Sequence, residues 1–310
     1  MTDGLKGVAA MATAATIWGL SGIFYRALSS VPPIEVLCHR TIWSVVFFGL
    51  VLGLQGRGTE IREALAQRRT WTTLGLSALL ISTNWLGFIY AVQNGFALEA
   101  SLGYYIFPLV AVALGCIVFG ERFRPVQIVA IGLATLAVLT QALGLGHVPW
   151  LALLLAGTFG LYGLIKKRLR LGPTVSVFIE TLILLPAALA FLAGIKAGLW
   201  TDLGGRTAGL LGNDVGTAAL LILSGPLTAV PLMLFSRAAR LISYASLGLV
   251  QYLNPTLQFA VAVLVFGEPF TRWDAIAFPL IWTGLALYSW EVWRQERLSR
   301  SAAISSGTVP

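Results

Sequence analysis

The sequence is dominated by apolar runs of about 20 residues, the length that a helix needs to cross the hydrocarbon core of a bilayer. Ten such runs cover about Leu5–Leu28, Ile34–Leu54, Trp71–Gln93, Glu99–Phe119, Pro125–Leu143, Pro149–Lys166, Pro173–Gly194, Gly216–Ala239, Ser243–Phe266 and Trp273–Trp293. Charged residues make up 11% of the 310 residues and hydrophobic residues 57%, whereas a soluble domain is about 25% charged. The runs are continuous and lack the alternation of transmembrane strands. We therefore expect an all-α integral membrane protein with ten transmembrane helices.

A long internal repeat divides the chain into two halves. Phe119-Gly120-Glu121 recurs 147 positions later as Phe266-Gly267-Glu268, and Pro32 recurs 141 positions later as Pro173. Repeats of this length are typical of secondary transporters. The predicted divisions are a first repeat with spans one to five, a second repeat with spans six to ten, and a disordered tail: residues 1–144, 145–298 and 299–310.

The basic residues of the connections predict the orientation. With the N-terminus in the cytoplasm, 16 of the 21 Lys and Arg residues fall in cytoplasmic segments and 4 in outer ones, as the positive-inside rule requires. Five spans per half is an odd number, so the second half enters the membrane inverted relative to the first. We expect both termini in the cytoplasm, Glu121 facing the cytoplasm, and its counterpart Glu268 facing outward, with a binding site near the midplane.

Ionisable residues inside the apolar runs are the first candidates for function, because each costs roughly 2.5 to 3.5 kcal/mol at the centre of a membrane helix. Four of them cannot face lipid by accident: Glu35, His39, Arg40 and Glu180. His39 and Glu180 are repeat equivalents, each about 10 Å from the start of its helix, and we expect a cavity between the halves to bring them close. No basic residue lies near Glu180 on its own helix, so it needs a partner across the bundle or a water-filled cavity. In the alternative, Glu35 and Arg40 only pair locally or reach toward the interface.

Polar and aromatic residues of the central runs are the second group of candidates. Asn84 and Trp85 lie in the middle of the third run, and Gln251 lies on a polar or small face of the ninth. The repeat image of that face, in the fourth run, contains Ser101 and Tyr104. Close packing of small residues is the alternative, and it accounts for the Gly and Ala positions but not for Tyr104 or Gln251.

Other classes of function have no signal in this chain. Two Cys and two His show no metal-ligand spacing, and no phosphate-binding loop or dinucleotide fingerprint stands after a strand. The net charge of +8 comes from short connections rather than from one basic face. We expect no cofactor, no metal, no nucleic-acid partner and no enzymatic activity.

Short motifs spread along the chain carry a family resemblance. They are Trp18-Gly19, His39-Arg40-Thr41-Ile42-Trp43-Ser44, Asn84-Trp85, Leu98-Glu99-Ala100-Ser101-Leu102-Gly103-Tyr104, Gly120-Glu121-Arg122-Phe123, Ile179-Glu180-Thr181, Gln251-Tyr252 and Pro255-Thr256. In this order they resemble the RarD-type branch of the EamA transporters, in the drug/metabolite transporter superfamily, over about Leu5–Trp293. The resemblance implies a multi-pass permease of the inner (cytoplasmic) membrane, usually described as an exporter of small metabolites or amphiphilic drugs such as chloramphenicol.

The leading hypothesis is a secondary-active exporter of small amphiphilic metabolites or drugs, chloramphenicol-like or amino-acid-like, that works by alternating access. The expected substrate-binding residues are Trp18, Arg40, Asn84, Trp85, Ser101, Tyr104, Glu180, Gln251 and Tyr252, and those expected for proton coupling or ion pairing are Glu35, His39, Glu99 and Glu180. We expect the third, fourth, eighth and ninth spans to line a central cavity, with the charged faces of the second and seventh. Arg40 would meet an anionic group, and Glu180 an amine or a proton.

Three alternatives remain open from the sequence. The first is uptake or uniport of amino acids or vitamins. A membrane-embedded enzyme is disfavoured because the ionisable groups lie within the spans, and a non-transporting subunit is disfavoured by the cost of burying charges without use. The expected partners are a small-molecule substrate, protons and membrane lipids, with the chain a monomer or a weak homodimer.

Overall fold

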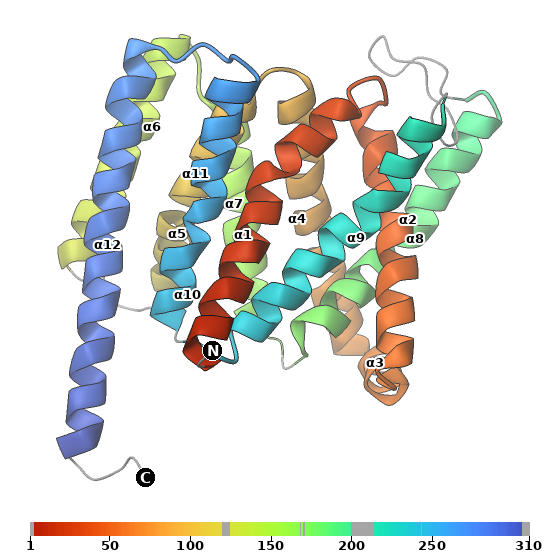
Figure 1. Cartoon of the computed structure of the whole chain (residues 1–310), viewed down its shortest axis with the longest axis horizontal. Helices are drawn as coiled ribbons and strands as arrows, with labels where there is room; N and C mark the ends of the chain where they lie inside the picture. Colours follow the sequence, from red (N-terminus) through yellow and green to blue (C-terminus); the bar gives the residue numbers. More distant parts are fainter. Residues whose placement is uncertain are drawn as a thin grey trace.

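The computed structural model describes residues 3–119, 125–167, 169, 171–199, 214–242 and 244–305. These residues form a bundle of helices and contain no strand (Figure 1). In chain order the helices are α1 (Asp3–Ala27), α2 (Pro33–Leu54), α3 (Gly58–Ala66), α4 (Arg68–Gln93), α5 (Ala97–Phe119), α6 (Pro125–Leu145), α7 (Trp150–Lys167), α8 (Pro173–Lys196), α9 (Val215–Ala238), α10 (Tyr244–Gln251), α11 (Leu253–Ala260), η1 (Val261–Val265) and α12 (Arg272–Ser305).

Each predicted span coincides with a helix or with a run of helices. The ninth corresponds to α10, α11 and η1 together, and the others to single helices. Within the described residues, seven segments are long and apolar enough to cross a membrane, and two shorter apolar helices cover Ala97–Ala111 and Trp150–Lys166. The structure thus has the helices of a multi-pass membrane protein, while the total of ten spans stays a prediction.

The ninth predicted span is not one continuous helix. α10 ends at Gln251, α11 begins at Leu253, and the π-helical turn η1 follows. Pro255 accounts for the break, because it has no N–H group to donate to the carbonyl of Gln251 four residues earlier. At the break, the amide of Tyr252 donates to the carbonyl of Leu249, three residues back, at 3.3 Å.

Two helical segments lie outside the predicted spans. α3 forms in the connection between the second and third spans, and Arg57 just before it pairs with Glu60 in its first turn at 2.6 Å. α12 continues to Ser305, so residues 299–305, which we expected in a disordered tail, are helical. The sequence offers no Gly or Pro between Gly284 and the end of α12 to stop the helix.

The start of α1, α3 and the end of α12 lie at one end of the bundle (Figure 1), which we call the N-terminal end; the opposite end is the distal end. A chain that crosses the bundle an even number of times must begin and end on the same side, as observed. The cytoplasmic location of this side stays a prediction, and Glu121 lies outside the described residues.

Helix contacts recur at positions related by the repeat. Gly19 of α1 packs against α11, where an added Cβ would lie 2.6 Å from Cβ of Leu257. Gly160 of α7 packs against α5 in the same way, with a side-chain atom of Val110 at 3.2 Å from the added Cβ. Gly160 is 141 positions after Gly19, and Leu257 is 147 positions after Val110. Equivalent residues therefore make equivalent contacts in the two halves. Two further pairs of repeat counterparts, α2 with α8 and α6 with α12, pack directly against each other.

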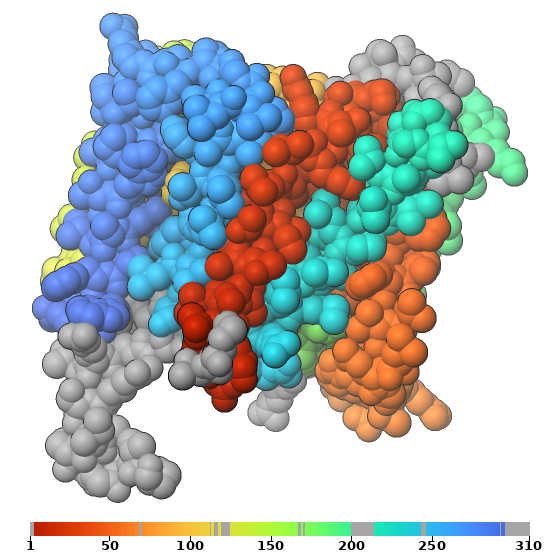
Figure 2. Space-filling model, viewed as in Figure 1, coloured from red at the N-terminus to blue at the C-terminus, as the bar shows by residue number. Residues whose placement is uncertain are grey.

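The surface of α1 suits a lipid environment. Figure 2 shows α1 in contact with α9 on one side and with α10 and α11 on the other. Apart from Lys6 and Arg26 near its two ends, the large side chains of α1 that remain exposed are apolar, namely Leu5, Val8, Leu20 and Ile23. The largest buried apolar cluster lies behind them and joins α1, α4, α5, α7 and α12. An apolar exterior around an apolar interior is the pattern of a helix bundle in a bilayer.

Candidate functional site

The guanidinium group of Arg40 is held by aromatic rings. Its Cζ atom lies 4.0 Å from the ring centroid of Trp85 and 5.6 Å from that of Tyr25. Arg40 is 7% exposed, and its Nε atom has no hydrogen-bond partner within the described residues. A cation over an aromatic face gains about 0.5 to 2 kcal/mol, which is less than the cost of burying a charge without an anion. The guanidinium thus retains the capacity to bind an anionic ligand.

Tyr104 completes this cluster, which we call the aromatic site: Tyr25, Arg40, Trp85 and Tyr104. Its hydroxyl donates to Oδ1 of Asn84 at 2.9 Å and lies near enough to the Arg40 guanidinium for an electrostatic interaction. The side-chain amide nitrogen of Asn84 donates to the carbonyl of Leu155 at 2.9 Å and to Oγ1 of Thr158 at 3.1 Å. Asn84 thus uses its polar atoms to join α4, α5 and α7 and to orient Tyr104. Its expected contact with substrate stays a prediction.

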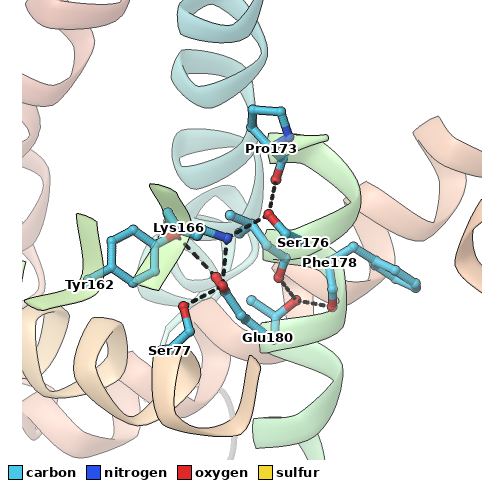
Figure 3. A network of polar contacts seen from close by, with 9 residues as sticks. Ser77, Tyr162, Lys166, Pro173, Ser176, Phe178 and Glu180 are labelled. Carbon is cyan, nitrogen blue, oxygen red and sulfur yellow. Dashed lines mark hydrogen bonds and ion pairs between the residues drawn. The ribbon is translucent and has the colours of Figure 1, made fainter. Parts of the chain in front are cut away.

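Glu180 lies in a second group of polar side chains, which we call the polar network: Ser77, Tyr162, Lys166, Ser176 and Glu180 (Figure 3). The Glu180 side chain is fully buried, and Lys166 pairs with its Oε1 atom at 2.6 Å. Ser77 of α4 donates to the same oxygen at 2.7 Å, and the Tyr162 hydroxyl donates to Oε2 at 3.2 Å. The partner across the bundle that Glu180 required is therefore Lys166. Lys166 ends the sixth predicted span, a position where a basic residue is expected as a topology signal.

The aromatic site and the polar network lie at different levels of the bundle. Trp85 and Ser77 are eight residues apart on α4, which corresponds to about 12 Å along the helix axis. His39 adjoins Arg40 in the sequence, and its expected approach to Glu180 stays a prediction.

The repeat nevertheless relates two residues of the polar network to residues in or beside the aromatic site. Lys166 is 141 positions after Tyr25, and Glu180 is 141 positions after His39. The lysine of the polar network thus stands at the position that a tyrosine of the aromatic site has in the first half, and its glutamate stands at the position of His39.

Two glutamates cap helices near the distal end. Oε1 of Glu99 accepts hydrogen bonds from the amides of Leu151, at 3.0 Å, and Ala152, at 3.4 Å, in the first turn of α7. The carboxylate of Glu268 accepts from the first two amides of α5, Ala97 at 2.8 Å and Leu98 at 2.7 Å. A carboxylate at a helix N-terminus satisfies amides that lack partners within the helix. Glu99, expected in proton coupling or ion pairing, serves as a cap in this structure.

Glu268 lies in the connection after η1, outside the candidate spans. Burial raises the pKa of its carboxyl above the usual range, whereas the amides of Leu98 and Ala97 and the charge of Arg26 act in the opposite direction.

α1 and α4 cap each other at the distal end. Nη1 of Arg26, in the last turn of α1, donates to the carbonyl of Val92 at 3.0 Å. In return, Nε2 of Gln93, the last residue of α4, donates to the carbonyl of Leu28 at 2.8 Å. Each side chain donates to a carbonyl group at or just after the end of the other helix, and the carbonyl of Leu28 also accepts from the amide of Val31 at 3.0 Å.

The other expected site residues are dispersed. Ser101 is buried and donates to the carbonyl of Leu98 in its own helix at 2.7 Å. The ring of Trp18 lies 6.2 Å from that of Phe235 on α9. Glu35 and His39 are buried in α2, at 0% and 3% exposure. Their expected roles stay predictions.

A cavity of about 500 Å³ opens between α5, α10, α11 and α12. Aromatic side chains dominate its lining: Tyr105, Tyr252, Trp282, Trp290 and Trp293. This cavity is lateral rather than central. Tyr252 belongs to this lining, whereas Gln251, the residue before it at the end of α10, does not, and the expected contact of Gln251 with substrate stays a prediction. A hollow of about 10 Å³ among α1, α4, α5, α11 and η1 is near the minimum for a single water molecule, so the bundle is closely packed there.

Comparisons with known proteins give consistent results. Residues 5–141 match the EamA-like transporter family. Protein RarD of Streptomyces exfoliatus is 41% identical over 287 residues, covering 92% of this chain and 88% of its own. Protein RarD of Escherichia coli K12 is 36% identical over 296 residues, covering 95% and 98%. An uncharacterised transporter of Pseudomonas aeruginosa is 40% identical over 285 residues, covering 92% and 93%. A crystal structure that is 18% identical has a similar fold, with a TM-score of 0.57 over 91% of this chain and 96% of its own.

Proposed function

Because the chain belongs to the EamA-like transporter family, as a RarD-type membrane transporter, we propose that it exports small amphiphilic metabolites or drugs that carry an anionic group. Export takes place across the inner membrane by secondary-active alternating access, through ten spans in two inverted repeats. The substrate's anionic group binds Arg40, and its apolar part lies against the rings around Arg40.

The observation that carries this proposal is the state of Arg40. It is a buried cation with aromatic neighbours, and none of the ion pairs among the described residues includes it. A permanently charged guanidinium in such a place is costly, and a ligand that supplies a carboxylate or a similar anion relieves that cost. The aromatic rings favour a ligand with a flat or apolar body.

The repeat-related contacts of Gly19 and Gly160 support alternating access. Equivalent residues then pack in equivalent ways in both halves. If each half adopts the conformation of the other, the bundle reaches a second arrangement of similar energy, which is open to the other side of the membrane. The aromatic site and the polar network then lie on opposite sides of the midplane, so that each half exposes one of them in turn.

Glu180 serves in this proposal as the proton-coupling group. It is fully buried and has a basic partner, and intramembrane carboxylates of this kind are frequent parts of proton pathways. The separation of about 12 Å from the level of Arg40 makes simultaneous contact of both groups with one α-amino acid unfavourable. The anion site and the coupling site are thus separate.

The test compares small molecules released by cells that express the native chain, Arg40→Ala or Arg62→Ala at matched membrane levels. Arg62 is an exposed residue of α3 and serves as the matched control. We expect a discrete set of anionic amphiphiles outside cells with the native chain and with Arg62→Ala, reduced at least tenfold with Arg40→Ala. Equal release by Arg40→Ala contradicts the assignment of Arg40. Accumulation inside the cells indicates uptake instead.

A further inference from the structure

The two oxygens of the Glu180 carboxylate are not equally engaged. Oε1 accepts from Lys166 at 2.6 Å and from Ser77 at 2.7 Å. Oε2 accepts from the Tyr162 hydroxyl at 3.2 Å, which is at the long end of O–H···O hydrogen bonds. A proton that binds Glu180 is therefore best accommodated on Oε2, where the bond that it replaces is weakest.

The two charged partners differ in their freedom to move. Glu180 is 0% exposed, whereas the side chain of Lys166 is 20% exposed. The Lys166 ammonium also has alternative partners, since it donates to Oγ of Ser176 at 2.5 Å and lies 5.1 Å from the Tyr162 ring centroid. Lys166 stands in the last turn of α7, where the ends of the backbone dipoles favour a cation. The lysine can thus leave the pair, whereas the glutamate cannot.

We propose that Lys166 competes with a proton for Glu180 and thereby couples transport to proton movement. This inference rests on the proposed transport function and adds Lys166, to which no role has been assigned, as a positioning residue. When Lys166 leaves, an uncompensated buried carboxylate is strongly unfavourable, so a proton from water at the N-terminal end binds Oε2. Lys166 keeps its own proton and shifts toward Ser176 and water, and the new O–H group on Oε2 replaces the hydrogen bond that Tyr162 donated there.

The exchange has a mechanical consequence. In this structure the pair joins α7 to α8 (Figure 3). Protonation removes the charge that holds Lys166, so the tie between the two helices weakens while the Ser77 contact to α4 persists. The N-terminal end of the bundle then opens when Glu180 is protonated and closes when Lys166 returns to the ion pair.

A purely structural role predicts different behaviour. A fully bonded polar network also stabilises helix packing without any exchange. In that case the chemistry of the pair is interchangeable, because a glutamate on α7 and a lysine on α8 hold the helices equally well. The coupling role and the structural role therefore involve the same contacts, and they differ in whether exchange of Lys166 for a proton depends on pH.

The first measurement needs no substrate. Infrared spectra of the purified chain in lipid nanodiscs are recorded over a range of pH. The band of a protonated carboxyl group that disappears in Glu180→Gln is assigned to Glu180. In Lys166→Met we expect the midpoint of this band to rise by roughly 1 to 3 pH units, because a close positive charge has been removed. The same change at Lys196, an exposed residue at the end of α8, should leave the midpoint in place. An unchanged midpoint in Lys166→Met overturns the proposal whatever the chain transports.

The second measurement uses the exchanged pair, Lys166→Glu with Glu180→Lys, in vesicles with an imposed pH gradient. We expect thermal stability near the native value and at least a tenfold loss of gradient-driven release of the native chain's substrates. Recovery of both stability and gradient-driven release overturns the proposal in favour of a structural pair. If the exchanged chain does not fold, the infrared midpoint decides. A native chain without any transport refutes the proposed function but leaves the infrared result valid.

Discussion

The Oε2 atom of Glu268 lies 2.7 Å from the backbone nitrogen of Leu98, so a residue of the second predicted repeat caps a helix of the first. Oε1 of the same carboxylate accepts from Ala97. Both oxygens thus contribute to one contact between the halves, and this contact can be removed with a single substitution.

Substitution of Glu268 by Ala should lower the free energy of unfolding at neutral pH by about 1 kcal/mol, because the first amides of α5 lose their acceptor. Thermal unfolding in detergent measures the change. Glu63→Ala is the control, because Glu63 is exposed on α3 and surface substitutions cost less than about 0.5 kcal/mol. Equal losses in the two variants contradict the capping role.

The same carboxyl predicts a dependence on pH. Burial raises the pKa of Glu268 above its usual range, whereas in the unfolded chain a glutamate has a pKa of about 4.3. Between these values the folded chain binds more protons, so the stability from this group is complete below about pH 4 and is lost as pH rises through the raised pKa. We expect the native chain to lose stability relative to Glu268→Gln across that interval. If the difference in the free energy of unfolding between the native chain and Glu268→Gln stays constant across that interval, the burial of the Glu268 carboxyl is contradicted.

Gly103 should tolerate no side chain. A Cβ atom there would lie 2.7 Å from the carbonyl oxygen of Ala152 and 3.0 Å from its Cα atom, both in the backbone of α7. Gly103→Ala forces α5 and α7 apart, and we expect a loss of about 1 to 3 kcal/mol. Gly132 has no atom within 4 Å of such a Cβ, so Gly132→Ala should be neutral or should stabilise α6 by up to about 1 kcal/mol. Thermal unfolding of the two variants tests the contrast, and equal effects contradict it.

Tyr104→Phe should destabilise the chain by about 1 to 3 kcal/mol, because Oδ1 of Asn84 then loses its donor in a buried position. Tyr90→Phe is a matched control, since Tyr90 is 38% exposed. Denaturant or thermal unfolding compares the two variants. A Tyr104→Phe chain as stable as Tyr90→Phe shows that Asn84 finds another donor.

Trp85→Leu should reduce transport of the anionic substrate by roughly 5-fold to 30-fold, the equivalent of 1 to 2 kcal/mol of lost cation–π contact with Arg40. Trp85→Phe keeps a ring below the guanidinium and should retain most of the activity. Initial rates of substrate release at matched membrane levels provide the measurement. If Leu and Phe at this position behave alike, the ring does not hold Arg40 for binding.

The helices were predictable because long apolar runs bounded by polar turns have few alternatives in a bilayer. The break at Tyr252 was missed, although Pro255 was visible in the sequence, because a proline in a membrane helix is often accommodated without interruption. α3 was missed because a short amphipathic helix resembles a polar connection in its composition.

The candidate site was predictable only in part. Arg40, Trp85 and Tyr104 were expected on chemical grounds, and the structure brings them together. Lys166 was missed because a basic residue at the end of an apolar run reads as a topology signal. The signal available in the sequence was that Lys166 is the repeat counterpart of Tyr25. Pairing across the bundle depends on how helices pack, which hydropathy alone does not specify.

The mutual capping of α1 and α4 limits how the distal end moves. Arg26 donates to a carbonyl of α4 and Gln93 donates to one that follows α1, so parting these two helices would break both hydrogen bonds. The two helices therefore move together as one rigid body, with its hinge at the distal end. A passage toward the distal side then has to form along the neighbouring seam, where the carboxylate of Glu268 holds the first turn of α5.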